Sequence, residues 1–427
     1  MIESRRIHPA WVVLGALAVC MLASSGLRAV FGVYIKPMEA EFGWSRSALS
    51  GVAAVSLLFL GAMGPLAGRL ADRWGPRRVI GVSLIVLAVG AIGSAFIQSL
   101  WQLYLMTGIL MAVGAGGVAM STGAAVVARW FDARRGLVMG LVGGAMSAGQ
   151  LVVIPLAAAL TFWFGWRTSF LTFGVLLLLL VLPIGVLFIR NAPEQHGGRP
   201  YGASGPLPAM APTTTIPKAE RVSVVEAARF PQFWLLLGTF FVCGYTSSGI
   251  VLTHFMPHAI EHNFSEFQAA TALGVVGAMN IVGTIGSGWL CDHFGRRGPL
   301  ATYYFVRGIS LLYLLYVHDV PSLHLWAAVF GLNWISTIPP TTTLTANIFG
   351  RFSVGELSGW IFFGHQVGSA LGAALAGWLY EWAGNYNAAF VSAAFLAFLA
   401  TGMAMAIREE PIHARRTPSA TPEPAVS

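Results

Sequence analysis

Long hydrophobic stretches separated by short polar loops run along almost the whole chain. Each is close to the roughly 20 residues that an α-helix needs to cross a bilayer. The pattern predicts an all-α membrane protein with 12 transmembrane helices, six on either side of a polar stretch. The stretches fall near residues 11–35, 47–67, 78–98, 101–127, 136–160, 168–190, 232–256, 268–291, 299–317, 323–347, 357–380 and 387–407.

The polar stretch at 191–230 is rich in Pro, Gly and Thr, a composition that cannot bury a core. We therefore expect a six-helix bundle over 1–190, a cytoplasmic linker over 191–230 and a second six-helix bundle over 231–408. The end of the linker, AERVSVVEAARF, can form a short amphipathic helix on the membrane surface. Residues 409–427 are rich in Pro, Ser and Thr and are expected to form a disordered tail.

Composition supports the membrane class and excludes a soluble enzyme. Hydrophobic residues make up 56% of the 427 residues and charged residues only 10%, whereas soluble domains carry about 25% charged residues. The net charge of +8 comes from short basic runs in the loops. If the N-terminus is cytoplasmic, 20 of the 25 Lys and Arg residues lie on that side and three on the other. This bias indicates two cytoplasmic termini, and a nucleic-acid partner is not expected.

A short motif occurs twice, at matching places in the two halves. GRLADRWGPRR runs from Gly68 to Arg78, and GSGWLCDHFGRR runs from Gly286 to Arg297. Superposing the two pairs Gly68 with Gly288, Asp72 with Asp292 and Gly75 with Gly295. The glycines allow close helix approach and a tight turn, and each Asp can accept hydrogen bonds from a neighbouring helix N-terminus. Such duplication is typical of transporters built from two related bundles.

The duplicated motif resembles the loop 2–3 signature of the major facilitator superfamily. The resemblance implies two pseudo-symmetric bundles around a central cavity, secondary active transport by alternating access, and no enzyme activity. It also implies a cytoplasmic gate held by Asp72 and Arg73, and by Asp292 in the second copy, where His293 replaces the arginine.

Narrower segments resemble bacterial monocarboxylate-porter-like and oxalate/formate-exchanger-like members. These are FGVYIKPMEAEFGWSRSALS (31–50), ARWFDARRGLVMG (128–140), GWRTSF (165–170) and FFGHQVGSALGAALAG (362–377). The resemblance implies a monomeric protein of the bacterial inner membrane whose partners are the lipid bilayer, a small molecule and a co-transported proton.

Two arginines, Arg28 and Arg307, are the only charged residues well inside hydrophobic stretches. Because an ionisable group at membrane depth is costly, each is a candidate functional residue. A cavity with positive charge and no carboxylate attracts an anion, and a guanidinium pairs well with a carboxylate. Ser24 lies one helical turn before Arg28 and shares its face. The alternative is that either arginine is structural and snorkels or holds backbone carbonyls.

Other polar residues inside the stretches are candidate substrate contacts or proton carriers. His365 is the proton-coupling candidate, because histidine titrates near physiological pH. Resembled porters commonly carry an arginine on helix 8, four residues after the position of Asn280, but Thr284 stands there. This departure keeps open a neutral or larger cargo, such as a vitamin, an aromatic compound or a drug. The remaining candidate substrate-binding residues are Tyr245, Asn333 and Gln150.

No cofactor or metal is expected. The three cysteines, Cys20, Cys243 and Cys291, show no metal-binding spacing, and the sequence contains no ATP-binding motif. A membrane sensor or a membrane-embedded enzyme is the third possibility, but no catalytic dyad or metal cluster supports it. The function that the sequence favours is transport of a small organic anion, such as a carboxylate, with a proton.

Overall fold

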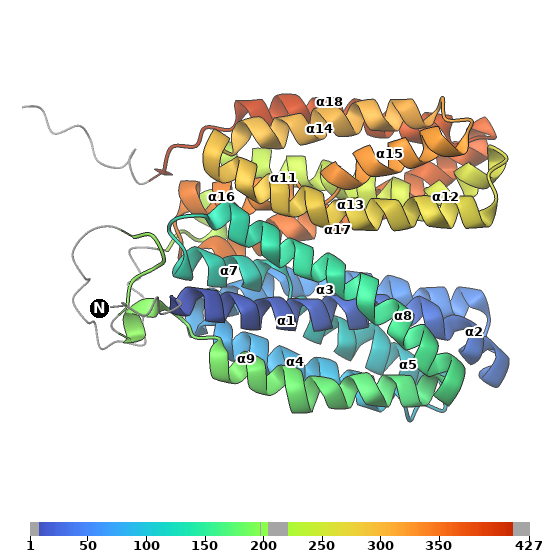
Figure 1. Cartoon of the computed structure of the whole chain (residues 1–427), viewed down its shortest axis with the longest axis horizontal. Coiled ribbons are helices and arrows are strands. Elements are labelled where there is room, and N and C mark those ends of the chain that lie inside the picture. Colours follow the sequence, from blue (N-terminus) through green and yellow to red (C-terminus); the bar gives the residue numbers. More distant parts are fainter. Residues whose placement is uncertain (1–7, 197, 204–220, 413–427) are drawn as a thin grey trace, which may run out of the picture.

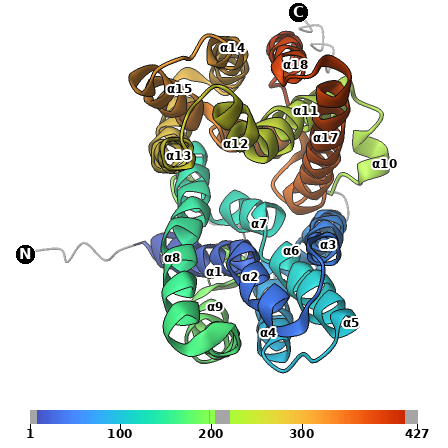
Figure 2. The same ribbon diagram turned by 90° about the vertical axis from the view of Figure 1, so that its right-hand side faces the viewer.

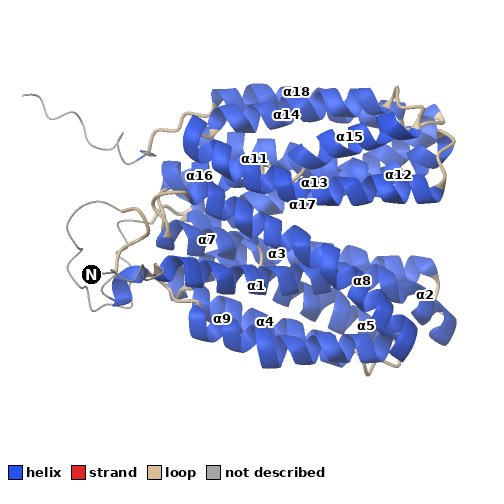
Figure 3. Ribbon diagram, in the orientation of Figure 1, coloured by secondary structure: helices blue, strands red, loops and turns tan. Residues whose placement is uncertain are grey.

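The computed structural model describes residues 8–196, 198–203 and 221–412. Helices dominate this part of the chain, and the only β-type pairing in it is an isolated bridge between Phe131 and Tyr201 (Figure 3). The all-α class expected from the hydrophobic pattern is confirmed. Two groups of roughly parallel helices lie side by side, α1 to α9 in one and α11 to α18 in the other (Figure 1). Their long axes follow the same direction, as in a bundle that crosses a bilayer.

The first group, the N-terminal bundle, consists of α1 to α9. Proline at the first helical position and serine caps begin several of its helices, as expected for helix N-termini. The bounds are α1 Pro9–Ala29, α2 Phe31–Phe42, α3 Arg46–Trp74, α4 Pro76–Ser94, α5 Leu100–Leu103, η1 Tyr104–Met111, α6 Ala112–Gly117, α7 Met120–Trp130, α8 Arg135–Leu176, η2 Leu177–Val181 and α9 Leu182–Phe188.

The second group, the C-terminal bundle, consists of α11 to α18, with the short α10 Val224–Ala227 preceding it. The view along the helices shows the two bundles facing each other, with α3 and α8 next to α17 and α13 (Figure 2). The bounds are α11 Pro231–Gly244, η5 Tyr245–Val251, α12 Leu252–Glu261, α13 Glu266–Phe294, α14 Arg297–Leu314, α15 Val320–Asn333, α16 Ile338–Phe349, α17 Val354–Ala383 and α18 Asn387–Ala406.

Eight helical runs in the described residues are long and apolar enough to cross a membrane. One of them, Arg135–Phe188, has 54 residues and turns back at Gly165, where φ is 82°, so it supplies two of the expected crossings. Large apolar side chains remain exposed on the outside, for example Leu179 (74%) and Phe395 (67%). Apolar surface of this kind is stable against lipid, not water.

Two of the expected helices are broken in the middle. The stretch predicted as 101–127 breaks at Val118 and Ala119, between α6 and α7. The stretch predicted as 323–347 breaks over residues 334–337, between α15 and α16. The two breaks lie in the fourth hydrophobic stretch of each half, and hydrophobicity alone did not predict them, because the side chains on either side stay apolar.

Parts of the linker and of the tail belong to the described residues. Tyr201 pairs with the end of α7 through its backbone N–H to the Trp130 carbonyl, 2.8 Å away. The predicted amphipathic helix is a single short turn, α10. Of the tail expected over 409–427, residues 409–412 are described, and Ile412 is buried. These segments gather at one end of the bundles (Figure 1). Arg221 of the linker donates to the Asp72 carbonyl there, and Asp292 lies at the same end, beside the start of α8. We call this the motif end, and the opposite end, which carries Phe42 and Glu261, the far end.

Candidate functional site

The first motif joins the two bundles through a carboxylate at a helix N-terminus. Asp72, near the end of α3, is 4% exposed. Its Oδ1 accepts the backbone N–H of Gly355 (3.3 Å), and its Oδ2 accepts that of Glu356 (2.7 Å). Both donors belong to the first turn of α17 in the other bundle. The carboxylate therefore satisfies two N–H groups that a helix leaves free and lies at the positive end of the helix dipole.

The second motif makes the same contact in the opposite sense. Asp292, near the end of α13, accepts the backbone N–H groups of Gly136 and Leu137, both at 2.8 Å. These donors lie in the first turn of α8 in the N-terminal bundle. Each bundle thus contributes one aspartate and receives one, which is the pseudo-symmetry that the repeat predicted.

An arginine outside the motif accompanies Asp72. Arg129, on α7 and 2% exposed, lies with its Nη2 3.8 Å from Asp72 Oδ1 and donates to the carbonyls of Ala71 (3.0 Å) and Asp72 (3.1 Å). Arg73, the expected gate residue, is exposed and makes no hydrogen bond or ion pair with any described residue. Among the described contacts, Arg129 is the arginine beside Asp72, because Arg73 lies about 100° further around α3 and its side chain is exposed.

The motif glycines lie where the bundles touch or the chain turns. A Cβ on Gly68 would collide with the carbonyl of Gly355, and a Cβ on Gly288 with the carbonyl of Gly136. Gly75 and Gly295 end their helices with φ of 92° and 79°, a conformation that side chains disfavour.

Hydrogen bonds between the bundles occur only from the middle of the molecule to the motif end, within the part of the chain described. The contact farthest from the motif end is Asn280 Nδ2 to Ser147 Oγ, 2.7 Å. An ion pair between Arg351 and Glu194, 3.1 Å, adds to the motif end. Arg221 donates to the Asp72 carbonyl (2.6 Å), and the Val222 N–H donates to Ser353 Oγ (2.7 Å). The structure is therefore closed at the motif end.

Arg28, on α1, stands apart from the other polar side chains of the described residues. Its side chain is half-buried, and no described residue forms a hydrogen bond or ion pair with it. Ser24, one turn earlier, is buried. The neighbouring Ser25 accepts a hydrogen bond from Gln150 Nε2 on α8 (3.1 Å). Gln150 is therefore held against α1, and Arg28 is left free to bind something else.

Arg307 is placed very differently, although the sequence made it a similar candidate. It is fully buried. Its Nη2 donates to the carbonyls of Asn333 (2.6 Å) and Trp334 (2.5 Å), and its Nε to Asn333 Oδ1 (3.3 Å). Its Nη1 donates to Cys243 Sγ (3.2 Å) and Thr246 Oγ1 (3.3 Å). All of these groups belong to the C-terminal bundle, so the guanidinium is saturated by the protein itself.

The remaining polar candidates fall into two groups, side chains that lie inside the C-terminal bundle and side chains that lie between the bundles. Asn333 contacts Arg307 and the Val329 carbonyl (2.6 Å), and the Tyr245 hydroxyl reaches Ser392 on α18 (3.1 Å), so both point into the C-terminal bundle. The Asn280 side chain instead lies between the bundles, where its Nδ2 donates to Ser147 Oγ on α8. Thr284, in the place of the missing arginine, donates to the Asn280 carbonyl (2.7 Å).

His365, on α17, is half-buried. Its ring packs against Phe240 and Phe362, with centroids 5.0 and 5.8 Å away. Its Nδ1 lies 3.1 Å from Gln366 Oε1. The imidazole also interacts with the side chain of Cys243 on α11, which in turn contacts Arg307.

Sequence reasoning missed Arg129 and Ser147. Arg129 lies inside the quoted segment 128–140, and its position beside a tryptophan at a helix end was the available signal. Ser147 lies in a run of small residues that indicates only close helix packing. Among the described residues, no group of three or more His, Cys, Asp or Glu side chains is arranged to hold a metal ion.

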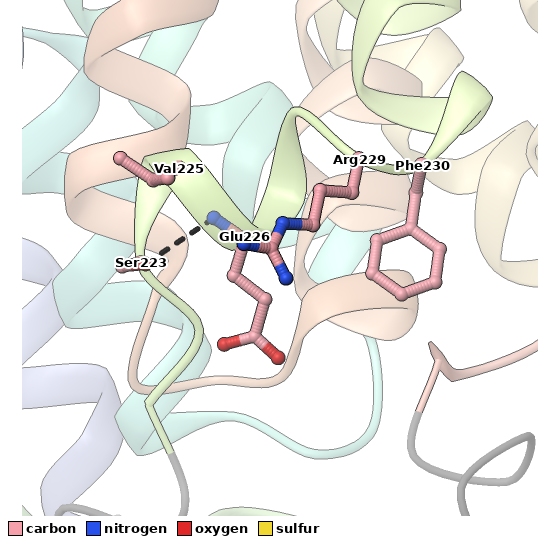
Figure 4. Close-up of a pocket in the computed structure, with 5 residues that line it drawn as sticks. All are labelled: Ser223, Val225, Glu226, Arg229 and Phe230. Atoms are coloured by element: carbon pink, nitrogen blue, oxygen red, sulfur yellow. Dashed lines mark hydrogen bonds between the residues drawn. The ribbon is translucent and has the colours of Figure 1, made fainter.

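A groove of about 320 Å³ lies on the surface of the linker (Figure 4). It is lined by Ser223, Val225, Glu226, Arg229 and Phe230. All five residues come from one short stretch, and the Ser223 side chain caps α10 by accepting the Glu226 N–H. The groove is thus a feature of the linker turn and is separate from the membrane arginines.

Comparison with known proteins agrees with this architecture. The model of the Major Facilitator Superfamily matches residues 17–372 and again 287–427. An uncharacterized MFS-type transporter, YcxA of Bacillus subtilis (strain 168), is 24% identical over 392 residues, covering 88% of this chain and 90% of the relative. Monocarboxylate transporter 11 of Mus musculus is 27% identical over 390 residues, covering 89% and 83%.

Two solved structures share the fold. The proton:xylose symporter XylE superposes with a TM-score of 0.69 at 16% identity, covering 94% of this chain and 97% of that one. The human organic anion transporter MFSD10 superposes with a TM-score of 0.70 at 17% identity, covering 95% and 100%. With the family model spanning most of the chain and the duplicated motif joining two helical bundles, this chain belongs to the Major Facilitator Superfamily of multi-pass membrane transporters and is not an enzyme.

Proposed function

We propose that this transporter carries a small organic anion, such as a carboxylate, together with a proton, and that Arg28 binds the anion. The observation that carries the proposal is the contrast between the two membrane arginines. Arg307 has five donor contacts inside its own bundle. Arg28 has none with a described residue.

The position of α1 supports an interior site. This helix packs mainly against α8 and α9 of its own bundle (Figure 2), and we infer that the half-buried Arg28 side chain faces the space between the bundles. A charge in that space without a partner is costly at membrane depth. An anionic cargo would remove the cost, because a carboxylate can accept two parallel N–H bonds from a guanidinium.

The named relatives favour the same cargo class. Several of the curated relatives are monocarboxylate transporters, and one solved structure with this fold is an organic anion transporter. The proton is proposed because of His365, whose imidazole lies half-buried in the C-terminal bundle. The structural neighbour XylE is a proton symporter.

The proposed orientation places the motif end in the cytoplasm. The basic loops cluster there, as the positive-inside rule requires. The structure then represents a state closed to the cytoplasm. We propose further that the protein acts as a monomer in a bacterial inner membrane, since each bundle finds its partner within the same chain.

The test is uptake by the purified full chain in proteoliposomes, with labelled pyruvate, lactate and oxalate as anionic probes and labelled xylose as a neutral probe. We expect Arg28→Ala to lower anion uptake at least tenfold, since a lost charge-assisted pair is worth about 1.5–3 kcal/mol. Arg28→Lys should retain part of the activity, because it keeps the charge but not the planar fork. Arg297→Lys, an exposed arginine on α14, is the matched control.

If a correctly folded Arg28→Ala protein took up the anionic probes at the wild-type rate, Arg28 would not be the anion site. Uptake of the neutral probe alone would favour the second candidate, a carrier of a neutral or larger compound. Thr284 supports that candidate, because it leaves α13 without the charge that the resembled porters carry at this position.

A further inference from the structure

The break between α15 and α16 is held by polar side chains from two neighbouring helices, α13 and α14. Residues 334–337 are not helical, so their backbone groups need partners in a region without water. Arg307, on α14, donates hydrogen bonds to the carbonyls of Asn333 and Trp334. On the other side of the break, the Ser287 hydroxyl, on α13, donates a hydrogen bond to the Ser336 carbonyl (2.6 Å).

The same break reaches the interface between the bundles. The N–H of Ile335 donates to Asn280 Oδ1 (3.0 Å), and Asn280 Nδ2 donates to Ser147 Oγ on α8 (2.7 Å). A continuous chain of hydrogen bonds therefore runs from Arg307 through the break and Asn280 to Ser147 in the N-terminal bundle.

Beyond the break, α16 fills the motif end between the bundles. It packs against α7 and α8 of the other bundle. A cavity of about 10 Å³ lies between α16 and the other bundle there, bordered by Thr342, Thr343 and Ala346 of α16. Such a volume holds one water at most. The direction of α16, which is set at the break, therefore decides whether the motif end is filled.

We propose that Arg307 is a positioning residue that fixes the break in the tenth membrane crossing and thereby keeps α16 in the place that closes the motif end. Arg307 does not bind cargo in this role. It holds two carbonyls in the one arrangement that directs Ile335 to Asn280. The proposal concerns the closing of the carrier and goes beyond the identity of its cargo.

The chain contains its own reporters for this closing. Cys291 lies on α13 at the motif end and is 1% exposed, next to Gly136 of α8. Cys20 lies on α1 inside the N-terminal bundle and is fully buried. Separation of the bundles at the motif end exposes Cys291 and leaves Cys20 covered, whereas general loosening of the protein exposes both.

The experiment measures the rate at which N-ethylmaleimide modifies each cysteine of the full chain in proteoliposomes, by mass spectrometry of its peptides. We expect Arg307→Lys and Arg307→Gln to raise the rate at Cys291 at least threefold and to leave Cys20 unchanged. The matched control, Arg297→Lys on the same helix, should behave as the wild type. Cys243 contacts Arg307 directly and is not used as a reporter.

A second variant tests the other end of the chain of hydrogen bonds without touching Arg307. Ser147→Ala removes the acceptor of Asn280 and should also raise the rate at Cys291 selectively, whether or not the Arg307 variants fold. An unchanged rate at Cys291 in Ser147→Ala would overturn the proposal. So would a parallel rise at Cys20 and Cys291 in Arg307→Lys, because that result assigns Arg307 to general stability.

Discussion

The carboxylate of Asp72 accepts the backbone N–H of Glu356 at 2.7 Å, although 284 positions separate the two residues. This bond joins α3 to the first turn of α17 and so ties the N-terminal bundle to the C-terminal one. Asp292 repeats the contact on α8. Any movement that opens the motif end must break at least one of these carboxylate contacts.

Loss of Arg129 should weaken the motif end more than loss of Arg73. Arg129→Gln removes the positive charge that lies nearest to the buried Asp72 carboxylate, and we expect the free energy of unfolding to fall by about 2 kcal/mol, the range for a charged hydrogen bond. Arg73→Gln should have little effect, because that side chain is exposed. Thermal unfolding of the two purified variants provides the comparison. Equal losses would show that Arg73, as the family resemblance implied, shares the gate.

Two glycines on α13, Gly286 and Gly288, should differ in their tolerance of an added methyl group. Gly288→Ala places a Cβ against the Gly136 carbonyl and should prevent the bundles from closing, with transport reduced tenfold or more. At Gly286 a Cβ meets nothing within 4 Å, so Gly286→Ala should transport normally. Uptake of the anionic probe by both variants in proteoliposomes tests this, and similar activity in the two would contradict the close packing described.

Removal of the His365 imidazole should separate cargo movement from the proton. In His365→Asn, accumulation of the anionic probe driven by an imposed pH gradient should be lost, while exchange of internal for external cargo continues. The reason is that exchange needs no net proton transfer. His293→Asn, an exposed histidine at the motif end, serves as the control. Intact gradient-driven accumulation in His365→Asn would exclude this residue as the proton carrier.

Removal of the Ser353 hydroxyl should release the end of the linker from the C-terminal bundle. Ser353→Ala removes the acceptor of the Val222 N–H, a bond worth about 1 kcal/mol, or roughly fivefold in population. Trypsin cleavage after Arg221 should accelerate by that factor. Ser223→Ala, which removes only the cap of α10, should leave cleavage after Arg221 nearly unchanged. If the two variants are cleaved at the same rate, the linker is not held at Ser353.

The duplicated motif shows which contacts can be predicted from a short stretch of sequence and which cannot. Its glycines and aspartates have recognisable uses, and the structure places Asp72 and Asp292 at helix N-termini because that is where a carboxylate finds unpaired N–H groups. The motif did not indicate which helices those would be. The donors on α17 and α8 lie in the opposite half of the chain and carry no signature, since any backbone N–H serves.

The hydrophobic stretches and the repeat determined the helical membrane architecture and the transporter family, because bilayer thickness acts on each segment separately and demands about 20 apolar residues. Only the tertiary structure separated Arg28 from Arg307. The two arginines are alike in sequence, each a lone charge in an apolar helix. The groups that saturate Arg307 come from α11, η5 and α15 and meet only after folding, and so the cost of burying a guanidinium is decided by neighbours remote in the chain.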